Sequence, residues 1–176
     1  MSNMSHESKL LIQFTSKSIR TRVNQIGKDL SKKYKNKNPI FIGVLNGSFM
    51  FLSDLMRSLT IDCEMDFIQL KSYDGKNSTG KVVLMKDFSI NIKNRHVILV
   101  EDIIETGKSL DFLLKKIEGF FPKSISIVTL LAKNKDRSFA FDIDHIGFEI
   151  SREFVVGYGL DYNQKYRQLD SIYILE

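Results

Sequence analysis

The sequence predicts an α/β protein whose mainly parallel central sheet is flanked by helices on both faces. Apolar segments of strand length alternate with helical patterns along most of the chain, and this alternation is typical of parallel sheets. With 176 residues, 43% of them hydrophobic, the chain is long enough for one domain with a substantial core. Because no repeat, low-complexity segment or linker divides it, we predict a single domain over residues 1–176.

The first predicted elements are a helix, a strand and a second helix. Residues 15–35 have apolar side chains at spacings of three and four, which line one face of a helix. Pro39 ends the lysine-rich stretch that follows, and lysines are favoured at a helix C-terminus. Residues 40–45 are apolar or glycine and predict a buried strand, and residues 49–59 predict the second helix.

The middle of the chain departs from this rhythm. Residues 63–71 alternate like a strand, residues 72–80 are polar and contain two glycines, and residues 82–85 resume a strand. Because strands follow one another here without a helix, we expect this stretch, together with the tail after Leu131, to form a small lobe. Such a lobe would cover the carboxyl edge of the sheet.

The second half of the chain resumes the strand and helix alternation. Residues 97–100 are four apolar residues in a row and predict a buried strand, and a helical pattern covers residues 108–120. Further strands are predicted over residues 124–131, 143–149 and 172–175.

A candidate site for a phosphorylated sugar follows the strand at residues 97–100. Glu101 and Asp102 stand at its carboxyl end, where ligands collect in open α/β sheets. The turn at residues 106–109 offers N–H groups and the positive end of a helix dipole to a phosphate. It is no Walker loop, because Asp102 stands five residues before Gly107 where that motif requires glycine.

Composition excludes some functions and leaves others open. The formal charge of +5 suits an anionic ligand or a nucleic acid, and equally a well-solvated basic surface. Cys63 is the only cysteine, so the chain forms no internal disulfide and no cysteine metal cage; neighbouring acids disfavour its thiolate. The scattered histidines do not suggest zinc. Without a signal core or a run of membrane-spanning length, we expect a soluble cytoplasmic protein.

Several segments resemble motifs of one enzyme family. Residues 97–110 are similar to the motif that binds 5-phosphoribosyl-1-pyrophosphate in type I phosphoribosyltransferases, and residues 154–162 resemble the purine-side motif of the hypoxanthine-guanine branch. Residues 43–48 match that branch's first active-site loop and residues 70–80 its mobile loop. Leu130 to Lys133 and Arg167 follow in the same order. The match runs from Pro39 to Glu176.

The resemblance implies a fold and a reaction. The fold is the type I phosphoribosyltransferase fold, with a small hood formed by the N-terminal segment and the region after about residue 134. In the reaction, which serves purine salvage, hypoxanthine or guanine displaces pyrophosphate from C1 of the donor and gives IMP or GMP. The cofactor is Mg²⁺. The family also implies a homodimer or homotetramer, with no membrane or nucleic acid as partner.

The resemblance assigns roles to individual residues. Glu101 and Asp102 hold the ribose hydroxyls, directly or through Mg²⁺, and Asp161 binds a second Mg²⁺. Residues 105–109 hold the 5-phosphate, and Arg167 meets pyrophosphate. The implied substrate-binding set is Asn46, Gly47, Ser72, Tyr73, Glu101, Asp102, Ile104, Glu105, Thr106, Gly107, Lys108, Ser109, Lys133, Phe154, Val155, Asp161 and Arg167.

The base has its own implied contacts. Lys133 donates to O6 of the purine, so a 6-amino base would leave a buried donor unpaired. Phe154 stacks on the ring, and the Val155 backbone meets its edge. Ser72 and Tyr73 belong to a loop that closes over the reaction and excludes water.

Two positions depart from the family pattern. Asn46 stands where some members carry lysine or arginine, so the grip on pyrophosphate depends more on backbone donors and Arg167. Glu105 stands where the family usually has the aspartate proposed to accept the N7 proton, and its extra methylene changes the reach by roughly an ångström. Glu105 is nevertheless the candidate catalytic residue. The family also leads us to expect a cis peptide between Leu45 and Asn46.

Two other functions remain as alternatives. The first is a nucleotide-sensing regulator of the same fold that binds nucleic acid, which the positive charge would suit. The second is a related enzyme acting on a pyrimidine or adenine, which Lys133 and Phe154–Val155 disfavour. Turnover with each base, compared with nucleic-acid binding, distinguishes these possibilities.

Overall fold

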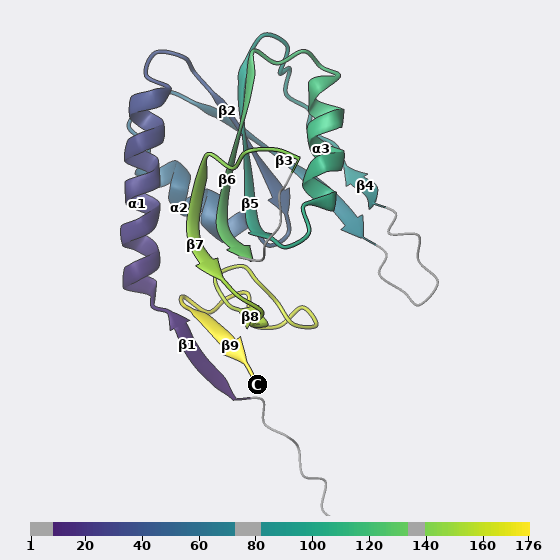
Figure 1. Ribbon diagram of the computed structural model, residues 1–176. Coiled ribbons are helices and arrows are strands. Elements are labelled where there is room, and N and C mark those ends of the chain that lie inside the picture. Colours follow the sequence, from purple (N-terminus) through teal and green to yellow (C-terminus); the bar gives the residue numbers. More distant parts are fainter. Residues whose placement is uncertain (1–8, 73–81, 134–139) are drawn as a thin grey trace, which may run out of the picture.

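The structure, a computed structural model, describes residues 9–72, 82–133 and 140–176 (Figure 1). Its strands form a six-stranded sheet in the order β4-β3-β2-β5-β6-β7 and a three-stranded sheet in the order β1-β9-β8. The elements are β1 (Leu10–Phe14), α1 (Ser16–Lys33), β2 (Ile40–Leu45), α2 (Phe49–Ser58), β3 (Glu64–Ser72), β4 (Val82–Lys86), β5 (His96–Ile104), α3 (Lys108–Glu118), β6 (Ser124–Lys133), β7 (His145–Ile150), β8 (Val155–Val156) and β9 (Ile172–Leu175).

The large sheet is parallel except at one edge. Strands β3, β2, β5, β6 and β7 all run in the same direction, and β4 pairs antiparallel with β3. The central strands are apolar without alternation because helices cover both faces: all of residues 40–44 and 97–101 are buried. The predicted α/β fold with a mainly parallel sheet is thereby confirmed.

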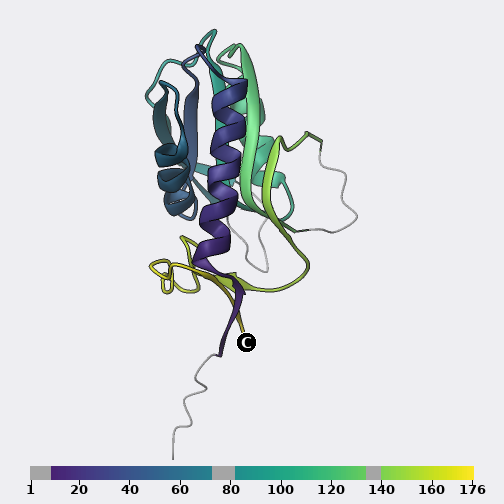
Figure 2. The ribbon, with the colours of Figure 1, turned by 90° about the vertical axis from the view of Figure 1, so that its left-hand side faces the viewer.

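The helices divide between the two faces of the large sheet. Helices α1 and α2 pack with Phe41, Ile98 and Val100 on one face, and α3 packs with Ile42 and Leu99 on the other. Neighbouring strand residues point to opposite faces, so the two cores alternate along each strand. Helix α1 starts beside the small sheet and runs to the far end of the large one (Figure 2).

The small sheet lies beyond the carboxyl ends of the large-sheet strands (Figure 1). We call it, with the connecting residues 151–171, the hood. Strand β9 pairs antiparallel with both β1 and β8, so residues from the two ends of the described chain lie side by side. Strand β1 is not among the elements predicted from the sequence, although Leu10–Phe14 is a short, mostly apolar segment.

The predicted membership of the subsidiary lobe was partly wrong. Strands β3 and β4 belong to the large sheet, because β3 pairs with the whole of β2, from Ile40 opposite Glu64 to Leu45 opposite Gln69, and β4 pairs with the end of β3. Strand β7 also extends the large sheet beside β6, although it follows residue 134. Pairing with a strand distant in sequence decided these positions, and local alternation carries no information about it.

Candidate active site

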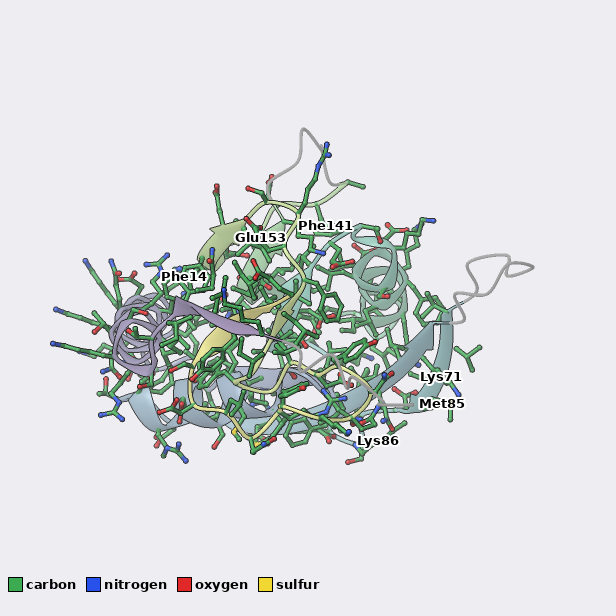
Figure 3. All side chains as sticks on the ribbon, turned by 90° about the horizontal axis from the view of Figure 1, so that it is seen from below. Phe14, Lys71, Met85, Lys86, Phe141 and Glu153 are labelled. Carbon is green, nitrogen blue, oxygen red and sulfur yellow. The ribbon has the colours of Figure 1, made fainter. Side chains whose placement is uncertain are left out.

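The loops that carry the predicted site residues meet at the carboxyl edge of the large sheet, facing the hood. Strands β2, β5 and β6 end there at Leu45, Ile104 and Lys133. In the view from below, Figure 3, the hood lies toward the viewer, with Phe14 at the α1 side and Lys71 at the β3 side. Residues far apart in the sequence are thus brought to one edge, as expected for an open α/β sheet.

A cavity of 320 Å³ lies where β5 passes into α3. The predicted phosphate turn forms most of its wall. Gly107 has φ 74° and immediately precedes the helix. The Lys108 N–H donates to Thr106 Oγ1 over 3.4 Å, and the N–H groups and dipole at the start of α3 favour an anion. The lining residues are Val82, Glu101, Ile103, Ile104, Glu105, Thr106, Gly107, Lys108, Ser109 and Leu110.

Glu101 lines this cavity, and Asp102 follows it along β5 with its carboxyl group toward Gly47. Glu101 is buried, and burial together with the adjacent Asp102 raises its pKa well above the usual range. Burial raises the pKa of Asp102 to about 6, although the Ile103 N–H donates to its Oδ1 over 2.8 Å. Raised pKa values mean that negative charge is poorly compensated here, so the pair favours a cation or hydroxyl donors.

The first active-site loop approaches these acids closely. A Cβ atom at Gly47 would lie 1.5 Å from Asp102 Oδ2, so the loop backbone occupies the space beside that carboxyl group. Asn46 Oδ1 accepts a hydrogen bond from Gln69 Nε2 over 3.1 Å. The Leu45–Asn46 peptide is cis, as the resemblance led us to expect.

Lys133 and Glu105 form an ion pair with each other. Lys133 Nζ donates to Glu105 Oε1, and the lysine side chain is 16% exposed against 50% for the glutamate. The sequence pointed to two separate tasks, O6 for Lys133 and N7 for Glu105, and gave no sign of this pairing. Because β6 pairs with β5 up to Ile104 opposite Ala132, the two residues that follow come together.

The hood contributes an aromatic side chain and an ion pair. Phe154 is 50% exposed, and its ring meets that of Tyr162 edge to face, with centroids 5.7 Å apart. Tyr162 was not among the predicted site residues. Arg167 Nη2 lies 2.8 Å from Asp161 Oδ1, and its Nη1 donates to the Gly159 carbonyl over 2.8 Å. The arginine therefore braces the loop of residues 159–161.

The structure thus groups most of the predicted site residues into three clusters. The first joins Glu101 and residues 104–109, the second joins Gly47 with Asp102, and the third is the hood group around Phe154. Val155 is buried in β8. Ser72 ends β3, and Tyr73 lies outside the described residues.

The predicted metal ligands do not by themselves enclose an ion. Among the described residues, no group of three or more histidine, cysteine, aspartate or glutamate side chains could hold a metal. Mg²⁺ is commonly bound by one or two carboxylates together with water and substrate phosphates. The donor set of Glu101 and Asp102 fits an ion that shares oxygen ligands with a bound substrate.

Comparison with known proteins identifies the family. Residues 15–163 match the family profile of the phosphoribosyl transferase domain. The hypoxanthine phosphoribosyltransferase of Buchnera aphidicola subsp. Schizaphis graminum is 45% identical over 172 residues, covering 96% of each chain. The hypoxanthine-guanine phosphoribosyltransferase of Streptococcus mutans is 37% identical over 94% of this chain and 92% of its own.

Solved structures agree with the sequence comparison. A crystal structure of a hypoxanthine phosphoribosyltransferase from Staphylococcus aureus matches with a TM-score of 0.90 and 37% identity, covering 99% of this chain and 95% of that one. The chain therefore belongs to the phosphoribosyltransferase family. Within it, the chain groups with the hypoxanthine and hypoxanthine-guanine phosphoribosyltransferases.

Some relatives are longer. A bifunctional TilS/HprT protein of Listeria innocua is 39% identical over 159 residues, but this chain spans only 24% of that protein's length. No helix in the described ranges is long and apolar enough to cross a membrane.

Proposed function

We propose that the protein is a purine salvage enzyme that transfers the 5-phosphoribosyl group from 5-phosphoribosyl-1-pyrophosphate to N9 of hypoxanthine or guanine. The products are IMP or GMP and pyrophosphate. The observation that carries this proposal is the cavity at residues 104–109. Its wall includes both a helix start suited to an anion and the buried Glu101, and Glu105 in the same wall forms an ion pair with Lys133.

The donor is assigned to the β5–α3 junction. N–H groups of residues 106–109 would bind the 5-phosphate, because the helix dipole favours an anion there. The Lys108 N–H would exchange its 3.4 Å hydrogen bond to Thr106 Oγ1 for the phosphate. Glu101 and Asp102 would accept hydrogen bonds from the ribose hydroxyls. Backbone donors at Asn46 and Gly47 would face the pyrophosphate, and Arg167 would add charge after leaving Asp161.

Mg²⁺ is part of the proposal. Glu101 and Asp102 would hold one ion together with substrate oxygens, and Asp161 would hold a second, largely through water. When bound, Mg²⁺ supplies positive charge that neutralises the departing pyrophosphate.

The base is assigned to the hood side. The purine would stack on the exposed ring of Phe154, with its edge at the Val155 backbone. Lys133 would turn from Glu105 to donate to O6, and this exchange would free the carboxylate to accept the N7 proton. N9 then bonds to C1 while the bond from C1 to the pyrophosphate oxygen breaks, and the electron pair leaves with pyrophosphate.

The regulatory alternative has less support. It is based on the charge of +5, which a phosphate-binding enzyme explains equally well.

We propose a cytoplasmic location, since the single free cysteine suits a reducing compartment. A homodimer or homotetramer is also proposed, and light scattering after size exclusion measures it.

The test is incubation of the protein with Mg²⁺, the donor and one of hypoxanthine, guanine, xanthine or adenine. We expect IMP or GMP with the first two bases and no AMP. A matched variant, Phe154→Leu, keeps an apolar side chain but removes the stacking surface, and should raise the KM for the base more than the KM for the donor. Absence of product with every base would refute the proposal.

A further inference from the structure

The segment that carries the proposed base site is tied to α2 by one hydrogen bond. Tyr158 Oη donates to Asp54 Oδ2 over 2.6 Å. Tyr158 lies in the hood and is 6% exposed, whereas Asp54 lies in the middle of α2. Burial and the Asp54 carboxylate raise the pKa of Tyr158, so its hydroxyl keeps the proton and remains a donor at neutral pH.

The backbone at Tyr158 has an uncommon conformation. Gly157, Tyr158 and Gly159 have φ values of 98°, 49° and 100°, and left-handed backbone is disfavoured for a tyrosine. Such a conformation persists where surrounding contacts determine it. Here the Tyr158 N–H donates to the Leu169 carbonyl over 2.8 Å, and the buried side chain is anchored at its tip by Asp54.

The same two segments touch a second time at Gly159. A Cβ atom there would lie 2.2 Å from the Gly47 carbonyl oxygen, so the hood backbone rests on the first active-site loop. That loop leads directly into α2, which begins at Phe49. The Gly159 contact and the Tyr158–Asp54 hydrogen bond therefore fix the hood against the loop and its helix at two separate points.

We propose that Tyr158 is a positioning residue for the transfer reaction: through Asp54, it holds the segment of residues 154–156 at the distance from the first active-site loop at which N9 of the base reaches C1 of the donor. This inference rests on the proposed function, since it takes the base to bind against Phe154. Tyr158 acts through the placement of that segment and does not itself meet the reacting atoms.

The test compares variants that remove one partner with variants that keep the bond. Tyr158→Phe removes only the donor hydroxyl, and Asp54→Ala removes the acceptor. Asp54→Asn keeps an oxygen that accepts from Tyr158. The matched control is Tyr34→Phe, which removes a buried hydroxyl that shares a 2.6 Å hydrogen bond with Ser126 Oγ at the end of α1 away from the hood.

We expect Tyr158→Phe and Asp54→Ala each to lower kcat/KM for hypoxanthine by about tenfold, with a smaller change in the donor Kd, because the phosphate turn at the start of α3 is not moved. Asp54→Asn and Tyr34→Phe should retain wild-type kcat/KM. The double variant Tyr158→Phe/Asp54→Ala should be no worse than Asp54→Ala alone, since both substitutions remove the same bond and Asp54→Ala also removes the ion pair with Arg57.

Two results would overturn the proposal. The first is that Tyr158→Phe and Tyr34→Phe have the same kcat/KM for hypoxanthine while their melting temperatures fall by similar amounts. The second is that the Tyr158 and Asp54 variants lose affinity for the base and for the donor equally, and that this loss follows the loss of melting temperature. If the wild-type protein transfers to no base, the proposed function is refuted instead. The role of Tyr158 is then decided by calorimetry of IMP binding, which should be weaker in Tyr158→Phe but not in Tyr34→Phe.

Discussion

Replacing Glu105 with glutamine is expected to lower kcat by about a hundredfold or more, because two effects of very different size oppose each other. The variant loses the ion pair with Lys133, which frees the lysine for the base. Since half of the Glu105 side chain is exposed, solvent screens the pair, and such pairs contribute about 0.2–1 kcal/mol, or at most about fivefold in affinity. Loss of a general base costs about 10²–10⁴-fold.

The assay is steady-state transfer to hypoxanthine at saturating donor and Mg²⁺, with donor binding measured separately by calorimetry. We expect the KM for the base to stay equal or fall, and the donor Kd to stay unchanged. Glu105→Asp is the matched variant, because it keeps a carboxylate and should retain more activity than Glu105→Gln. If Glu105→Gln turned over within about threefold of wild type, the general-base role would be refuted.

Three further predictions concern other parts of the molecule. Asp66→Asn should cost about 2 kcal/mol of unfolding free energy in urea melts at pH 7. Burial would raise the pKa of Asp66, but hydrogen bonds from Ser89, Phe67 and neighbouring backbone hold this pKa well below its usual range. The stability that the carboxylate contributes is therefore present above about pH 4 and lost on further acidification. A cost that stays constant to pH 2 would contradict it. Gly47→Ala should abolish transfer with little loss of melting temperature, because the new methyl group displaces the Asp102 carboxyl group; an active variant would show that this carboxyl position is dispensable. EDTA should stop transfer reversibly without shifting the melting temperature, since the described residues offer no closed cage for an ion; a large shift would indicate a structural metal.

The parts of the site that could be predicted from the sequence are those whose functional residues lie next to one another in the chain. The apolar run before Glu101 marks a strand, and the small residues after Ile104 mark a helix start, so the phosphate turn needed no tertiary information. Cys63 is similar: burial and the adjacent Asp62 raise the pKa of its thiol, as the neighbouring acids indicated.

The parts that could not be predicted depend on pairing across long distances in the chain. Strand β3 looks like any half-buried strand, and only its parallel register with β2 places it in the large sheet. The Lys133–Glu105 pair joins residues 28 apart and the Tyr158–Asp54 bond residues 104 apart. Neither has a local signature, because a single lysine or tyrosine does not indicate which carboxylate it will meet.

The pairing of β1 with β9 has a consequence for biosynthesis. At about 5–20 residues per second, the roughly 160 residues between Phe14 and Ile172 take about 10–30 s to emerge from a ribosome. Throughout that interval Leu11 and Ile12 have no strand beside them, while the strands of the large sheet are already available. The small sheet is therefore completed last, and a nascent chain released before Ile172 would carry the phosphate turn while β1 and β8 have no strand to pair with.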